Sequence, residues 1–154
     1  TVKIAARDFQ LCWNCFDGEG FYQFKLYDKD GLHEIWTDST DVTFINTSEF
    51  RSLLAEGTTY KWNITAPDTD PIRKRVIRLV GQAEIDTLIQ KLITEEIPGE
   101  DKASNYFRIA YVLERKHYLG EAWAYYLLAR EADKTNPIIK KELTRFLNEF
   151  YLPH

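Results

Sequence analysis

The sequence predicts an α+β protein in which an antiparallel β-sandwich precedes a small all-α segment. Two periodicities predict this fold class. Up to Val80, apolar and polar residues alternate in short stretches separated by Gly, Asp and Pro, which is typical of strands with one buried face. From Gly81 onward, apolar residues recur every three or four positions, as on the buried face of a helix. This change of period divides the 154 residues into a β half, 1–81, and a helical half, 82–154.

Six short strands are expected in the β half, and short strands at this spacing are typical of a sandwich. Asp30-Gly31 is a hairpin-turn signal, and the loop between Pro67 and Pro71 must end a strand because proline lacks the N–H that a ladder needs. The expected strands are 9–15, 22–27, 33–37, 42–44, 60–65 and 72–80. By their parity, the aromatic residues expected in the core are Trp13, Tyr22, Phe24, Tyr60 and Trp62.

Four helices are expected in the helical half, each with apolar residues on one face. Pro98-Gly99 should end the first helix. Asn136 should cap the last one, with Pro137 in its first turn. The expected helices are, in order, 85–93, 101–116, 121–133 and 137–150.

The segment that enters the fifth expected strand resembles the same region of fibronectin type III domains. Leu54, Gly57 and Tyr60 have the spacing found there, and Trp13 lies where that family usually places a core tryptophan. The resemblance covers most of the β half and implies a fibronectin type III or immunoglobulin-like sandwich. It also implies a tyrosine corner, in which the hydroxyl of the buried Tyr60 bonds to backbone of the preceding loop, at 56–58.

The second and third helices resemble one tetratricopeptide repeat. Small residues at Ala110, Ala122 and Ala129 would let the two backbones approach closely. The chain has a single such unit, whereas solenoids generally need three or more, so the hairpin is expected to dock on its neighbours. A sandwich followed by such a hairpin resembles bacterial envelope proteins of unknown function. This resemblance implies scaffolding, adhesion or protein recognition in an extracytoplasmic location, in the periplasm or cell envelope.

Composition argues against several classes of function. The chain has 20 Lys and Arg against 24 Asp and Glu, a net charge of −4, which does not suit a nucleic-acid binder. Its longest unbroken apolar run, 122–129, is far short of the ~20 residues that span a bilayer, so this fragment is expected not to insert into a membrane. Met is absent even from the first position, so we expect a mature or trimmed fragment.

Cys12 and Cys15 have the spacing of a redox or metal-binding pair. A redox pair of this kind normally opens a helix, whose dipole lowers the pKa of the thiol. Here both residues fall on an expected strand, where positions three apart point to opposite faces. A zinc site would need two more ligands, and His33, His117 and His154 are scattered along the chain. A structural role is therefore favoured, and a small redox or metal protein is an alternative.

Other motifs also favour structural interpretations. Asp28-Lys29-Asp30-Gly31 begins like a calcium loop but lacks the closing Glu, so a hairpin turn is favoured. The basic run 73–75, followed by Arg78, fits the solvated face of an edge strand, with an acidic partner as the alternative. The sequence has no glycine-rich phosphate loop and no nucleophile motif. We therefore expect no enzyme, no cofactor and no bound metal.

Several aromatic residues do not fit a core face cleanly. They are expected either to pack the two halves together or to form an exposed surface for a protein or a sugar. The candidate partner-binding surface consists of Trp36, Tyr27, Trp123 and Tyr118. The expected function is a non-catalytic protein–protein interaction or scaffolding module, with the partner and the oligomeric state left open. A carbohydrate-binding module using Trp36 or Trp123 is an alternative.

Overall fold

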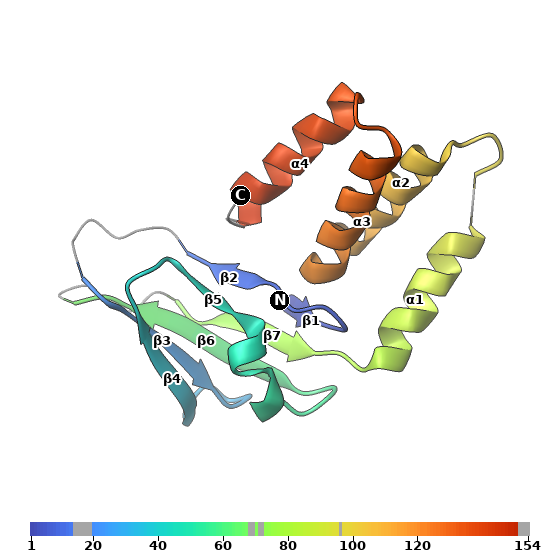
Figure 1. Ribbon diagram of the computed structural model, residues 1–154. Helices are drawn as coiled ribbons and strands as arrows, with labels where there is room; N and C mark the ends of the chain where they lie inside the picture. Colours follow the sequence, from blue (N-terminus) through green and yellow to red (C-terminus); the bar gives the residue numbers. More distant parts are fainter. Residues whose placement is uncertain (14–19, 68–69, 71–72, 96, 151–154) are drawn as a thin grey trace.

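The chain folds into a β half followed by four α-helices in the computed structural model, which describes residues 1–13, 20–67, 70, 73–95 and 97–150 (Figure 1). Two 3₁₀ turns, Thr47–Glu49 and Arg51–Leu53, connect the fifth strand to the sixth. The strands are β1 (Val2–Ile4), β2 (Gln10–Cys12), β3 (Tyr22–Tyr27), β4 (Glu34–Thr40), β5 (Phe44–Asn46), β6 (Thr59–Thr65) and β7 (Arg75–Leu79). The helices are α1 (Gln82–Thr94), α2 (Lys102–Arg115), α3 (Leu119–Ala132) and α4 (Pro137–Phe150).

The strands form two sheets. The larger has the order β1-β7-β6-β3-β4, and its neighbours are antiparallel except for the parallel pair β1–β7. The smaller sheet is the antiparallel pair β2–β5. The mixed α+β class expected from the two periodicities is therefore confirmed. The parallel strand β1 was not among the expected strands, because three residues carry too little pattern to predict one.

The position of β1 corrects the interpretation of the basic run. β7 was expected at a sheet edge, but β1 pairs with it from Ile77 to Leu79, so β7 lies inside the sheet. Arg75 precedes the stretch that β1 covers, and its guanidinium lies 5.6 Å from the centroid of the Trp62 ring. The edge-strand explanation is therefore wrong for Arg78, which pairs with Lys3 of β1. The run 73–75 is exposed and precedes the paired stretch, and the guanidinium of Arg75 also packs on a core aromatic.

The core of the β half is built around one aromatic ring. Phe24 is fully buried, and its ring centroid lies 5.5 Å from those of Phe50 and Trp62, both in a stacked arrangement. Leu11 of β2 and Ile45 of β5 belong to the same buried cluster, so the two sheets share this core. The five aromatic residues that the alternation placed in the core are all buried, and that prediction is confirmed.

The predicted environment of Tyr60 is confirmed in part. Tyr60 is buried, and its hydroxyl accepts the backbone N–H of Ala55 at 2.8 Å, one residue before the expected range 56–58. The loop backbone after Ala55 bonds elsewhere: the Gly57 N–H donates to Leu79 at 2.8 Å, and the Thr58 N–H donates to the Ala55 carbonyl. Gly57 has a φ of +75°, a conformation that glycine adopts without strain.

Replacing Tyr60 by Phe should lower the free energy of unfolding by about 1–2 kcal/mol, because the Ala55 N–H loses its partner next to the core. Urea denaturation measures this loss. Tyr111 is about half exposed on α2, so Tyr111→Phe is the matched control and should leave stability unchanged within ~0.5 kcal/mol. Equal effects of the two substitutions would contradict the role given to the Tyr60 hydroxyl.

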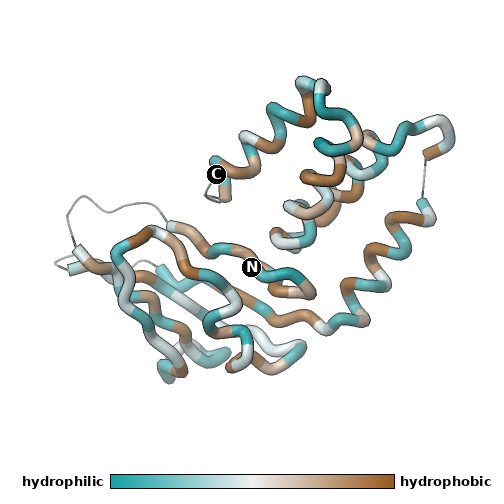
Figure 2. The backbone as a smooth tube through the Cα atoms, viewed as in Figure 1, coloured by the Kyte–Doolittle hydropathy of each residue, from teal (hydrophilic) through white to brown (hydrophobic). Residues whose placement is uncertain are grey.

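The helices begin and end close to the expected residues. Asp101 caps α2 by accepting the Ser104 N–H at 2.7 Å. The Asn136 side chain accepts the N–H groups of Ile138 and Ile139, so the predicted cap of α4 is confirmed. α2 and α3 form an antiparallel hairpin, and α4 packs beside it (Figure 1). Each helix carries both hydrophobic and hydrophilic residues along its length, as the colours in Figure 2 show.

Within the described part of the chain, no helix has the length and apolar character needed to cross a membrane.

A buried ionic group fixes α4 to the hairpin. The Glu114 carboxylate of α2 accepts the Tyr126 hydroxyl at 2.6 Å and a guanidinium nitrogen of Arg145 at 2.9 Å. Arg145 also bonds to Glu142 and Glu149 on its own helix. Burial and the bond to Glu114 raise the pKa of Tyr126. One buried carboxylate therefore joins all three helices.

The start of α3 forms the junction with the β half. The Lys3 N–H of β1 donates to the His117 carbonyl at 3.0 Å, and the Arg7 N–H donates to the Glu121 carboxylate at 2.8 Å. Gly120 allows this approach, because a Cβ there would lie 2.8 Å from the Arg7 carbonyl oxygen. The buried residues of both halves form one continuous cluster. The two halves thus share one buried interface.

Candidate functional site

Two of the four candidate aromatic residues lie on opposite faces of the larger sheet. Trp36 faces Leu26 across the β3–β4 ladder, so it shares the core side, whereas the next residue of β3, Tyr27, points to the outer side. Trp36 is half-buried, and its ring lies 5.8 Å from Phe24. The Tyr27 ring lies 3.8 Å below the ammonium group of Lys74. These two side chains therefore do not form one surface.

The other two candidates lie near the start of α3. Trp123 is half-buried and stacks on Phe146 of α4, with a centroid distance of 6.0 Å. Tyr118 is only 2% exposed, its hydroxyl donates to Glu84 of α1 at 2.9 Å, and Lys3 lies 4.5 Å above its ring. Tyr118 therefore packs the helices against β1 and does not face solvent, which removes it from the candidate surface. The physical reason is the close approach of α3 to β1.

The described half of the Cys-x-x-Cys motif has the environment of a structural cysteine. Cys12 ends β2, and its thiol lies 3.7 Å from the Gln10 carbonyl. Burial raises the pKa of Cys12 to about 12, so the thiol remains protonated at neutral pH. Cys15 lies outside the described residues. Among the described residues, no group of three or more His, Cys, Asp or Glu side chains could hold a metal ion.

The Asp28 carboxylate is occupied within its own turn. One oxygen accepts the N–H groups of Gly31 at 2.8 Å and Leu32 at 3.0 Å, and the other lies 2.9 Å from a ring nitrogen of His33. The bond to His33, followed by the backbone bonds, lowers the pKa of Asp28 to about 2. These contacts stabilise the turn between β3 and β4. The residues spaced like the start of a calcium loop therefore form this hairpin turn, as the sequence predicted.

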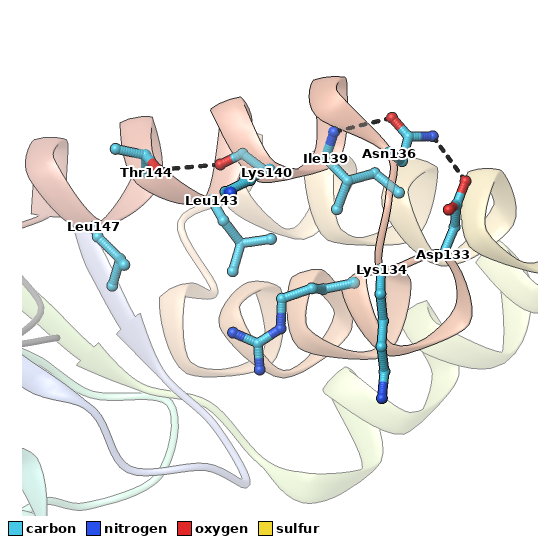
Figure 3. A pocket seen from close by; sticks show the side chains of 9 residues that line it. Asp133, Lys134, Asn136, Ile139, Lys140, Leu143, Thr144 and Leu147 are labelled. Atoms are coloured by element: carbon cyan, nitrogen blue, oxygen red, sulfur yellow. Dashed lines mark hydrogen bonds between the residues drawn. The ribbon is translucent and has the colours of Figure 1, made fainter.

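The structure adds a pocket that was not among the predicted sites, between α3 and α4 (Figure 3). Its volume is about 260 Å³. Three apolar side chains form its inner wall, three cationic side chains lie around it, and the turn between the helices closes one end. The lining residues are Arg130, Asp133, Lys134, Asn136, Ile139, Lys140, Leu143, Thr144 and Leu147.

The turn between α3 and α4 contributes Asp133, Lys134 and Asn136 to the lining of this pocket. The Asp133 carboxylate accepts the Thr135 N–H at 3.3 Å and the Asn136 amide at 3.3 Å, as Figure 3 shows for Asn136. Asn136 in turn caps α4 through the Ile139 N–H. Both polar side chains are therefore engaged in holding the turn. Asp133 is the one acidic residue of the lining, and its carboxylate accepts a backbone N–H of the turn.

The pocket has a positive rim. Arg130 and Lys134 both contact Glu131, at 3.5 Å and 3.2 Å, and the three side chains are about half or more exposed. Lys140 has no ion pair among the described residues, although its backbone carbonyl accepts the Thr144 hydroxyl at 3.1 Å. An apolar wall beside cationic groups suits a ligand that presents an acidic group next to an apolar one.

Sequence reasoning missed this pocket, although a signal for it exists. Basic residues occur at Arg130, Lys134 and Lys140, on both sides of the Asn136-Pro137 helix-start signal. That placement brings cations from two helices to one corner. Which faces of the two helices meet there is decided by packing.

No model of a protein family matches the sequence, and no curated protein matches it either. The chemistry of the site is therefore inferred from the residues of this chain alone.

Proposed function

We propose that this chain is a non-catalytic protein-interaction module that acts outside the cytoplasm. In this proposal the β half is a fibronectin type III-like sandwich and α2–α3 is a single tetratricopeptide-like hairpin. Two observations support the sandwich: the two sheets share one core, and the Tyr60 hydroxyl is bonded to the backbone of its preceding loop. The extracytoplasmic location rests on the resemblance to bacterial envelope proteins.

The observation that carries the proposed function is the pocket between α3 and α4. It combines an apolar wall from Ile139, Leu143 and Leu147 with cations on its rim. Its volume of about 260 Å³ exceeds the ~150 Å³ that holds a benzene-sized ring, so one apolar side chain fits together with an acidic neighbour. A small anchored contact of this kind is typical of recognition of a short segment of a partner protein.

A displayed library of random peptides, selected on the purified chain, tests this proposal. Bound peptides should share an acidic residue next to a large apolar one. Lys140→Glu should weaken the binding of a selected peptide about tenfold or more, because it places a carboxylate on the rim. Lys141 is the neighbouring residue of α4 and does not line the pocket, so Lys141→Glu is the matched control. Equal effects of the two reversals, or no selected peptide, would refute the proposal.

A further inference from the structure

The larger sheet ends in an exposed strand. β4 is its last strand, and with seven residues it is as long as β6 at the centre of the sheet. The described residues place no further strand beside it. An edge strand presents unpaired N–H and C=O groups, which can pair with another strand of matching register.

The residues of β4 are complementary to a second, antiparallel copy of β4. Directly opposite residues of an antiparallel ladder have their side chains on the same face of the sheet. A two-fold axis perpendicular to the sheet satisfies this condition only when it lies midway between the two copies of one residue. When it lies midway between the two copies of Thr37, Trp36 of each copy faces Asp38 of the other, and these central positions pair regularly. β4 has a bulge at Ile35, which has no partner on β3, so the outer pairs Ile35–Ser39 and Glu34–Thr40 lie at the bulge. This register places no two like charges opposite each other.

The two neighbouring registers are unfavourable. An axis through Trp36 places Glu34 opposite Asp38, twice in the symmetric pair. An axis through Asp38 places the two Asp38 carboxylates opposite each other. Like charges directly opposite each other destabilise a ladder. The distribution of charge along β4 thus disfavours both neighbouring registers, and registers centred on Ile35 or Ser39 would pair fewer residues of β4 than the one centred on Thr37.

The flanks of β4 favour the same register. Leu32 is 78% exposed on one side of the strand and Val42 is 40% exposed on the other. The axis through Thr37 brings Leu32 of one copy towards Val42 of the second copy, and His33 towards Asp41. Pairing would therefore cover apolar side chains that the single chain leaves in water.

We propose that two copies of this chain associate through β4 as a symmetric dimer with one continuous sheet. Such an interface is isologous, so both copies use the same surface. The Ser39 N–H, which donates to the half-buried Asp38 carboxylate at 2.9 Å in the single chain, exchanges that partner for a strand partner. Trp36, half-buried at this edge, gains cover from the second copy.

Cysteine cross-linking tests the register directly. The two Thr37 Cα atoms on either side of the axis would be about 4.5–5.5 Å apart, within the range that a disulfide spans. Two Ser39 Cα atoms would be about 13 Å apart along the strands, too far to be joined. With oxidised glutathione as the oxidant, Thr37→Cys should form a covalent dimer and the matched variant Ser39→Cys should remain at the wild-type level. Equal cross-linking of the two variants would overturn the proposal.

Sedimentation of the unmodified chain provides the second measurement. The wild type should dimerise as its concentration rises from micromolar to millimolar. Thr37→Lys places two ammonium groups opposite each other across the axis. The dissociation constant of the dimer should therefore rise about fivefold. Ser48→Lys, at an exposed position outside β4, should leave it unchanged, and circular dichroism checks that both variants fold. A wild-type chain that stays monomeric throughout would exclude the dimer.

Discussion

Replacing Arg145 by Met should lower the free energy of unfolding by about 2–4 kcal/mol. The Glu114 carboxylate is 10% exposed and would remain buried next to Tyr126 without its cation. Removing one partner of a buried ion pair costs ~3–5 kcal/mol, and the value here is lowered because the Arg145 side chain is 36% exposed. Urea denaturation measures the loss.

Two further variants separate lost charge from lost packing. Glu114→Gln combined with Arg145→Met removes the buried charge and keeps an acceptor for Tyr126, so the double variant should be more stable than Arg145→Met alone. Arg130 pairs with Glu131 at the surface, and Arg130→Met should change stability by less than ~0.5 kcal/mol. If the double variant is no more stable than the single one, the buried charge does not cause the loss.

Glu121→Gln should make the chain more stable at neutral pH and its stability less dependent on pH. Glu121 is 2% exposed, and one of its carboxylate oxygens is buried without a hydrogen-bond partner. Burial raises the pKa of Glu121 above its usual value of 4.5, although the Arg7 N–H and the charges of Arg7 and Arg51 oppose this rise. The carboxyl is thus a titrating group placed inside the junction of the two halves.

The sign of the pH dependence follows from linkage. The unfolded chain releases this proton near the usual pKa of 4.5, and the folded chain retains it to a higher pH. The stability of the wild type should therefore fall as the pH rises from 4.5 to the raised pKa, by ~1.4 kcal/mol for each unit by which the pKa is raised. Above the raised pKa this loss is complete and constant, and below 4.5 it is absent.

Unfolding curves of wild type and Glu121→Gln between about pH 4 and pH 8 measure this difference. The gap between the two should widen with pH in favour of the variant. Glu131 is the matched control with the opposite sign, because Lys134 lowers the pKa of its carboxyl, so Glu131→Gln should be less stable than wild type above pH 4.5. A gap that does not change with pH would show that the Glu121 carboxyl has the same pKa in the folded and unfolded chains.

Local patterns predicted the elements that depend on neighbouring residues. Alternation identified β3 and β6 and the faces of Phe24 and Trp62, because successive side chains of a strand point to opposite sides. Asn136 predicted the start of α4, because its side chain bonds to N–H groups two and three residues ahead. For Tyr60, the resemblance to another family, rather than a local pattern, implied a hydroxyl bond at 56–58, and the observed partner is the neighbouring Ala55.

The candidate site was predicted less well. Trp36, Tyr27, Trp123 and Tyr118 were grouped by how poorly they fit a core stripe, and that property carries no information about where each lies. Trp36 and Tyr27 face opposite sides of one sheet, and Tyr118 is buried against β1. The pocket beside Lys140 was missed because it depends on the separation of two helices.

The sequence by itself determined the α+β class, the change from strands to helices near Gly81, the aromatic core and the caps, because periodicity and short-range hydrogen bonds set all of these. The tertiary structure alone decided that β1 pairs with β7, that β4 is an edge, and that Glu121 lies in a junction. Each of these features joins residues far apart in the chain. Their free energy comes from pairing, desolvation and close approach between those distant residues, which no local pattern records.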